Sequence, residues 1–238
     1  MQHFFLSPES FQEGHVVIKD QNVLHQLMRV LRMRIGEPFV ALDNNGNEYL
    51  CTLISLNDDF ADCLIIEKRK NANESPLYVT LYQALPKKIE LFEWVLQKGT
   101  ELGVSAFVPL VSARTERDEI SKRDRLERIL KEAAEQSERG KMPVLRDIMT
   151  FEEALEPTAD EVTVVLHGRG EVTPLAASLS ELHHHKSCRL FVGPEGGFTD
   201  EEITHAQEHG ALVRSLGTRV LRTETAGIAA ASLLLLSE

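Results

Sequence analysis

The chain has 238 residues, with 37 Asp or Glu against 26 Lys or Arg and a net charge of -11. That length suits one large domain, or a small domain followed by a larger one. The negative charge argues against nucleic-acid binding through the overall field, so any such binding must use a local basic surface. Three scattered cysteines without a C-x-x-C pair indicate a reduced cytosolic chain rather than a disulfide framework or a zinc site.

The first residues, "MQHFFLSPESFQEG", carry no basic stretch and no long apolar run. Nowhere does the chain reach the roughly 18 consecutive apolar residues that span a membrane. We therefore expect a cytoplasmic protein without a membrane segment.

The early segments predict mostly strands: "HVVI", "FVAL", "EYLCTLI" and "DCLIIE". Asn45-Gly46 lies between two of them and predicts a hairpin turn. One helical stretch, "NVLHQLMRVLRM", interrupts the strands. The polar segment "NANESP" (71–76) reads as a linker. We expect a small β domain over residues 1–72.

Residues 73–238 alternate strand-like and helix-like segments, from "YVTLYQAL" to "TAGIAAASLLLLS". Such alternation predicts an α/β domain with a largely parallel sheet and helices on its faces. Gly103 stands where a helix C-cap belongs.

Three apolar strands end in glycine-bearing loops: "HGRG" (167–170), "GPEGG" (193–197) and "GTRVLRTETAG" (217–227). In an open parallel sheet, ligands bind outside the carboxyl ends of the strands. Thr199 followed by Glu202 predicts a capping box that starts a helix directly after the second loop.

The second loop does not match the known phosphate-binding motifs. Pro194 supplies no N–H, and Glu195 would repel a phosphate. The loop suits a ligand that lacks phosphate and carries positive charge, such as S-adenosylmethionine. In the alternative reading, the glycines only form tight turns and Glu195 is solvated.

Five stretches, "HQLMRVLRM", "LQKGTELGV", "EAAEQSERGKMP", "FVGPEGGFTDEEI" and "SLGTRVLRTETAGIAA", closely resemble the RsmE-type 16S rRNA uridine-N3 methyltransferases of the SPOUT class. The resemblance covers nearly the whole chain in the same order. It implies a small PUA-like β-barrel, then a C-terminal α/β domain whose trefoil knot holds S-adenosylmethionine. It also implies a homodimer and a target uridine in 16S rRNA, within the 30S subunit.

Carried onto this sequence, the resemblance implies a cofactor site built from all three loops. Arg222 would orient the base or a phosphate, because its guanidinium presents a rigid fork of donors. Glu224 would accept the proton or serve only as a capping carboxylate at a helix N-terminus. The implied cofactor-binding residues are Leu166, His167, Gly168, Gly193, Pro194, Glu195, Gly196, Leu216, Gly217, Val220, Leu221 and Arg222.

Residues 114–146 contain ten Lys or Arg against eight Asp or Glu, in contrast with the negative total. A helix with an apolar stripe would leave Arg125, Arg128 and Arg139 pointing outward, where they could bind RNA backbone. Arg29 and Arg32 raise the same possibility in the first domain. The alternative is a solvated charged face with ion pairs along the helix.

His183, His184 and His185 are consecutive and have no supporting Cys, Asp or Glu cluster, so we expect a polar loop and no metal. The resemblance implies an S-adenosylmethionine-dependent methyltransferase that acts on N3 of a uridine in 16S rRNA. Two alternatives stay open: a 2′-O-ribose methyltransferase of the same class, and a non-catalytic RNA-binding assembly module.

Overall fold

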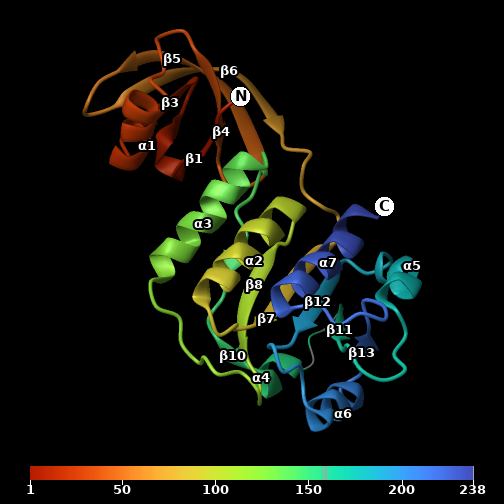
Figure 1. The fold of residues 1–238 in the computed structure, drawn as a ribbon. Helices are drawn as coiled ribbons and strands as arrows, with labels where there is room; N and C mark the ends of the chain where they lie inside the picture. Colours follow the sequence, from red (N-terminus) through yellow and green to blue (C-terminus); the bar gives the residue numbers. More distant parts are fainter. Residues whose placement is uncertain (157, 159, 238) are drawn as a thin grey trace. The chain divides into compact units, whose positions relative to one another are not determined.

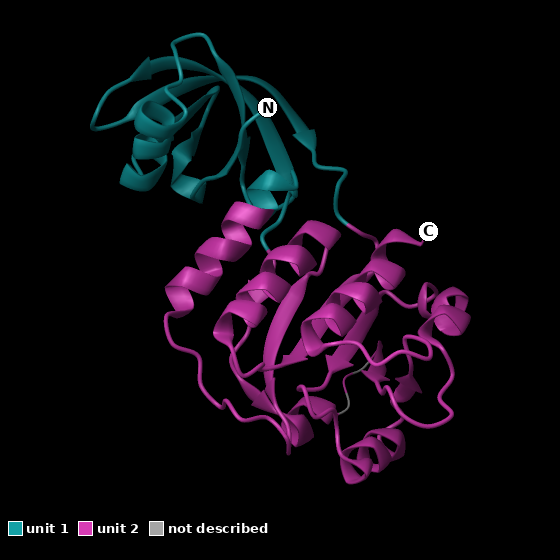
Figure 2. Cartoon of the chain, in the orientation of Figure 1, with its two compact units in different colours: residues 1–74, 134–142 teal, residues 75–133, 143–238 magenta. Residues whose placement is uncertain are grey.

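The structure is a computed structural model that describes residues 1–156, 158 and 160–237. The chain forms two compact units (Figure 2). The first contains Met1–Glu74 and Ala134–Met142, and the second contains Ser75–Ala133 and Pro143–Glu238. Nothing in the sequence pattern indicates that residues 134–142 return to the first unit.

The first unit is built on a six-stranded sheet with the order β1-β4-β5-β6-β3-β2 (Figure 1). Only β1 and β4 pair in parallel, and the other neighbours are antiparallel. Its elements are β1 (His3–Phe5), a 3-10 turn (Pro8–Ser10), β2 (Phe11–Gln12), β3 (His15–Ile18), α1 (Gln21–His25), a π-helical turn (Gln26–Val30), β4 (Pro38–Leu42), β5 (Asn47–Leu56) and β6 (Ala61–Lys70).

The predicted hairpin turn between β4 and β5 is confirmed. Gly46 has a φ of +80°, a conformation that favours glycine. Asp43 closes the turn, because its carboxylate accepts hydrogen bonds from the backbone N–H groups of Asn45 and Asn47, at 2.8 and 3.1 Å.

The predicted helix after β3 is shorter and less regular than expected. Its last turn is a π-helix, in which the Leu31 N–H donates to the Gln26 carbonyl. Arg32 then adopts a φ of +53° and ends the helix. π-Helical turns are rare and leave no distinctive sequence pattern, so hydrophobic spacing alone predicts an ordinary helix here.

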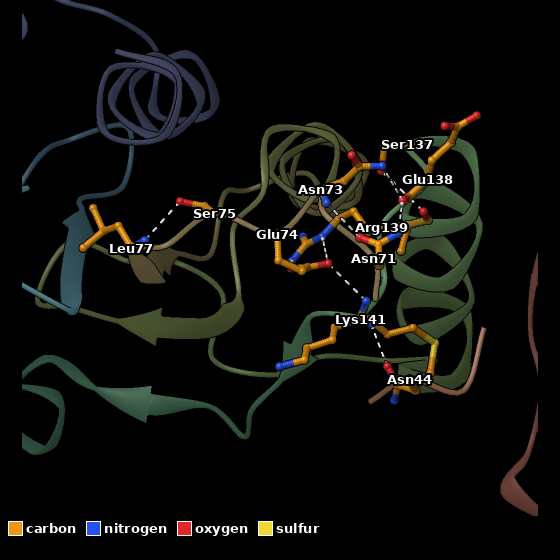
Figure 3. A network of polar contacts seen from close by, with 12 residues as sticks. Asn44, Asn71, Asn73, Glu74, Ser75, Leu77, Ser137, Glu138, Arg139 and Lys141 are labelled. Atoms are coloured by element: carbon orange, nitrogen blue, oxygen red, sulfur yellow. Dashed lines mark hydrogen bonds and ion pairs between the residues drawn. The ribbon is translucent and has the colours of Figure 1, made fainter. Parts of the chain in front are cut away.

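Residues 134–142 are held in the first unit by a polar network (Figure 3). The side-chain amides of Asn71 and Asn73 both donate to the Glu138 carbonyl at 3.0 Å. Glu74 accepts from Arg139 Nη2 at 2.9 Å and from the Lys141 N–H at 3.1 Å. These partners are far apart in the sequence, so local patterns do not reveal them.

The second unit has a seven-stranded sheet, ordered β10-β8-β7-β12-β11-β13 with β9 also paired to β8. All pairs among its described strands are parallel, as predicted. Its elements are β7 (Tyr78–Ala84), α2 (Ile89–Leu102), β8 (Ala106–Val111), α3 (Arg123–Gln136, whose end lies in the first unit), β9 (Val144–Leu145), β10 (Met149–Thr150), α4 (Phe151–Leu155), β11 (Glu161–Leu166), a 3-10 turn (Leu175–Ser178), α5 (Leu179–Leu182), β12 (Ser187–Val192), α6 (Asp200–Glu208), β13 (Leu212–Arg214) and α7 (Thr223–Leu236).

Helices cover both faces of this sheet (Figure 1). Leu81 and Leu190 lie in one core cluster with residues of α2, α3 and α7. The next residues along the strands, Tyr82 and Phe191, lie in a second cluster with residues of α4 and α6. This alternation follows from the two-residue period of strands that are buried on both sides.

The predicted C-cap of α2 is confirmed, because Gly103 has a left-handed φ of +105°. Among the described residues, no helix combines the length and the apolar character needed to cross a membrane.

Candidate active site

The three glycine-bearing loops meet around one cavity in the second unit. They follow β12, β11 and β13, which are neighbours in the sheet, so their carboxyl ends open at the same edge. The cavity has a volume of about 120 Å³ and is open to solvent. Its lining residues are Leu166, His167, Gly168, Arg169, Val192, Gly193, Pro194, Glu195, Gly196, Gly197, Phe198, Leu216, Arg219, Val220, Leu221, Thr223 and Ala226.

Every residue expected at the cofactor site lines this cavity except Gly217 and Arg222. Seven lining residues lie outside the expected set: Arg169, Val192, Gly197, Phe198, Arg219, Thr223 and Ala226. Two of them, Thr223 and Ala226, lie three apart at the start of α7. Residues at that spacing share one helix face, so the helical pattern could have indicated both.

The second loop is a tight turn at the end of β12. The Gly197 N–H donates to the Pro194 carbonyl at 2.8 Å, and Gly197 has a φ of +68°. A Cβ on Gly193 would lie 3.1 Å from the Phe198 nitrogen, so glycine lets the turn close on itself. The predicted capping box of Thr199 and Glu202 is confirmed and starts α6 directly after the turn.

Segments that follow β7 and β8 hold this loop in place. The Lys87 N–H donates to Glu195 Oε1 at 3.0 Å. Arg114 Nη1 donates to the carbonyls of Gly196 and Phe198, at 2.8 and 3.2 Å. Each bond involves a charged group, which makes it stronger than a neutral one. Glu195 thus has a structural partner and is also exposed to solvent.

The two residues expected to act in catalysis stand beside the cavity but do not line it. Arg222 is the N-cap residue of α7, and its side chain is exposed. Glu224 lies in the first turn of α7 and is partly buried. A carboxylate in that turn interacts favourably with the helix dipole, so the capping reading of Glu224 keeps its physical basis.

The arginines expected to bind RNA differ in their availability. Arg29 and Arg32 are exposed in the first unit. Arg125 binds Glu93 through two bonds of 2.6 and 2.9 Å, which lower the pKa of Glu93. Arg128 Nε lies 3.8 Å from Oε1 of Glu132, which is one turn further along α3.

The expectation that Arg139 points outward is wrong. It follows the end of α3, so the helical spacing does not extend to it. Its side chain is 3% exposed and forms an ion pair with Glu74 (Figure 3).

The chemistry of the cavity fits a cofactor with an apolar ring and a positive charge. Leu166, Leu216 and Leu221 supply apolar walls, and the glycines leave backbone groups accessible. Glu195 is the carboxylate among the lining residues, and Arg169 and Arg219 line the same cavity, so the site suits a ligand that carries a sulfonium or an ammonium together with a negative group.

Comparison with known families identifies the class of protein. The RNA methyltransferase domain family matches residues 73–235, and the RNA methyltransferase PUA domain family matches residues 18–66. The fold and the site thus belong to an RNA methyltransferase with an N-terminal PUA domain.

Individual relatives narrow the class. The ribosomal RNA small subunit methyltransferase E of Bacillus subtilis is 35% identical, and the match covers 98% of this chain and 95% of the relative. The protein of that name from Synechocystis is 38% identical over 93% of this chain and 73% of the relative. The chain belongs to the ribosomal RNA small subunit methyltransferase E family.

Solved structures agree with this assignment. A ribosomal RNA small subunit methyltransferase E from Neisseria gonorrhoeae, bound to S-adenosylmethionine, superposes with a TM-score of 0.88 at 31% identity, covering 100% of this chain and 98% of that one. A methyltransferase from Legionella pneumophila in complex with the same cofactor gives a TM-score of 0.81 at 30% identity, with 99% and 97% covered.

Proposed function

We propose that this protein transfers a methyl group from S-adenosylmethionine to N3 of a uridine in 16S rRNA. The observation that carries the proposal is the convergence of the three glycine-bearing loops on one cavity with a single lining carboxylate. The relative from Neisseria gonorrhoeae, bound to S-adenosylmethionine, supports the choice of cofactor. The names of the relatives support the choice of rRNA.

In this proposal, the predicted loop residues hold the cofactor. The apolar side chains of Leu166, Leu216 and Leu221 would hold the adenine, and the backbone groups of Gly193 and Gly196 would be available to bind the cofactor. Glu195 would bind a positively charged group of the cofactor. Bound S-adenosylmethionine supplies an activated methyl group.

The residues of the chain then have to place the uracil and help its N3 proton leave. Arg222 is exposed at the start of α7, directly after the cavity-lining Leu221. We assign it the orientation of the base or of its phosphate, because a guanidinium can hold two acceptors at once. Glu224 accepts the proton or caps α7.

Arg29 and Arg32 are the arginines that we expect to bind the RNA backbone in the first unit. Both are exposed, and backbone contacts position an RNA without reading its sequence. Arg125 and Arg128 can take part only if RNA phosphate competes with Glu93 and Glu132.

We further propose that the protein acts in the cytoplasm as a homodimer on the 30S subunit. The apolar character of α7 supports a dimer, since Leu236 is 66% exposed and Ile228 and Leu233 are only partly buried. We also expect a trefoil knot in the C-terminal α/β domain, and residues 1–72 and 73–238 to act as two domains.

The test supplies the purified protein with methyl-labelled S-adenosylmethionine and one RNA substrate at a time. Unmodified 30S subunits, 50S subunits and bulk tRNA serve as the three substrates. We expect label only in 16S rRNA from the 30S sample. Label in tRNA would favour the other methyltransferase reading, and absence of both labelling and cofactor binding would favour an RNA-binding assembly module.

A further inference from the structure

The side chain of Gln83 connects two segments that line the cavity, the GPEGG loop and the start of α7. Gln83 lies in β7 and is completely buried, and it does not line the cavity. Its Nε2 donates to Thr223 Oγ1 at 2.8 Å. Thr223 Oγ1 in turn donates to the Gly193 carbonyl at 2.6 Å. Thr223 and Gly193 both line the cavity.

We infer that Gln83 is a positioning residue, which sets the first turn of α7 against the GPEGG loop and so shapes the cofactor site through Thr223. This inference rests on the proposed function of the cavity. We call the two hydrogen bonds that join Gln83 to Thr223 and Thr223 to Gly193 the Gln83 relay.

The direction of the Gln83 relay is fixed at both ends. Gln83 Nε2 also lies 3.3 Å from the Ala84 carbonyl, which can only accept, so the amide nitrogen must face that side. The Thr223 hydroxyl accepts a hydrogen bond from this amide, and its single O–H donates a hydrogen bond to the Gly193 carbonyl. Hydrogen bonds in a buried, low-dielectric place reinforce one another, so a chain of two can hold both loops in one relative position.

Stability alone does not favour a glutamine here. Gln83 Oε1 is buried and accepts no hydrogen bond from the described residues, and a buried acceptor without a donor carries a desolvation cost. A Cβ on Gly227 would lie only 2.6 Å from that oxygen, so α7 can approach Gln83 closely only because residue 227 is glycine. An apolar residue of similar shape would avoid the cost but could not hold Thr223.

The test replaces both polar partners by apolar side chains of similar shape, in the double variant Gln83→Met/Thr223→Val. The double variant removes the unsatisfied Gln83 Oε1 but also takes the 3.3 Å bond from the buried Ala84 carbonyl, so we expect the melting temperature to change only slightly. The Gly193 carbonyl is only partly buried and can bind water. We expect the affinity for S-adenosylmethionine, measured by calorimetry, to fall by about tenfold or more, with KM for the cofactor raised accordingly.

Two single variants separate positioning from folding. Thr223→Ser keeps the hydroxyl and should keep wild-type affinity, whereas Thr223→Val should lose affinity. Gln83→Met and Thr223→Val also form a double-mutant cycle. The double variant should weaken cofactor binding by clearly less than the product of the two single effects, because both substitutions break the same relay.

The outcomes distinguish the inference from the proposed function. Normal affinity in a folded double variant overturns the Gln83 relay and leaves the cofactor assignment intact. Equal losses in Thr223→Ser and Thr223→Val also overturn it, because the hydroxyl would then be irrelevant. A folded wild-type protein that does not bind S-adenosylmethionine overturns both.

Discussion

Glu195 accepts a hydrogen bond from the backbone N–H of Lys87 at 3.0 Å, which ties the middle of the GPEGG loop to the segment after β7. The Lys87 ammonium is also ion-paired with Glu116 at 2.7 Å, and this pair together with the nearby Glu195 raises the pKa of Lys87. Glu195 thus has two tasks in our account: it holds the loop, and it presents a negative charge to the cofactor.

Two substitutions of Glu195 separate these tasks. Glu195→Gln keeps an oxygen for the Lys87 N–H but removes the charge. We expect its affinity for S-adenosylmethionine to fall by about two- to fivefold, a modest effect because the residue is exposed. S-adenosylhomocysteine lacks the sulfonium but keeps the ammonium, so its affinity should stay unchanged if Glu195 faces the sulfonium and should fall equally if Glu195 faces the ammonium. Glu195→Ala should weaken both ligands, and calorimetry that finds identical losses in both variants would assign Glu195 to the loop alone.

Gly196→Val should abolish cofactor binding without unfolding the protein. A Cβ at this position would already lie 3.1 Å from Arg114 Cδ, so a branched side chain must displace Arg114 from the loop and also enters the space needed by the ligand. Arg114→Ala is the matched control, since it removes the two hydrogen bonds and leaves the space open. We expect calorimetry to find a smaller loss of cofactor affinity for the control. Near-normal affinity in folded Gly196→Val would mean that the cofactor site lies elsewhere.

The sequence predicts the local features of this protein well, because each depends on residues close together in the chain. The capping box of Thr199 and Glu202 and the turn at Gly46 are examples. The three loops are also predictable, since a parallel sheet brings strand ends to one edge. The position of Arg139 is not, because its partner Glu74 is distant in the sequence. The Gln83 relay cannot be predicted for the same reason, because its residues lie at strand or helix ends that are far apart in the sequence.

Arg32→Ala should weaken binding to 30S subunits and lower the salt dependence of that binding by up to about one unit in the log–log slope. The reason is the loss of one exposed phosphate-binding charge. Affinity for S-adenosylmethionine should not change. Arg125→Ala is the control, because Glu93 already neutralises Arg125 and the slope should change less. An unchanged slope in Arg32→Ala would remove Arg32 from the RNA interface.

Arg222→Lys keeps the charge but loses the bidentate fork of donors. If Arg222 orients the uracil or its phosphate, single-turnover rates on saturating 30S subunits should fall strongly while cofactor affinity stays nearly intact. Wild-type rates in this variant would mean that Arg222 does not touch the substrate.

Glu224→Gln distinguishes a proton acceptor from a helix cap. A proton acceptor predicts slow turnover that recovers as pH rises, because the uridine then ionises without help. A capping role predicts a loss of about 1 kcal/mol of stability with turnover largely kept. Denaturation curves and rates across the pH range, measured on the same preparation, decide between them.

Stability should decline in alkaline solution because of the buried thiols. Burial raises the pKa of Cys51, Cys63 and Cys188 from 9.0 to about 12. Above pH 9 the unfolded chain loses thiol protons that the folded chain keeps, so the stability contributed by the neutral thiols is present below pH 9 and lost as pH rises toward 12. Urea unfolding of the wild type and of Cys51→Ala/Cys63→Ala/Cys188→Ala should show a steeper alkaline decline in the wild type. Equal slopes would contradict this.

The most direct test of the proposed function locates the methyl group on the nucleoside. Unmodified 30S subunits are incubated with the wild-type protein and labelled S-adenosylmethionine, the 16S rRNA is digested, and the nucleosides are separated and identified by mass spectrometry. Our account predicts the label on the base of a single uridine, as N3-methyluridine, and none after incubation with Gly196→Val. A label on the ribose 2′-oxygen, or none in 16S rRNA, would contradict it.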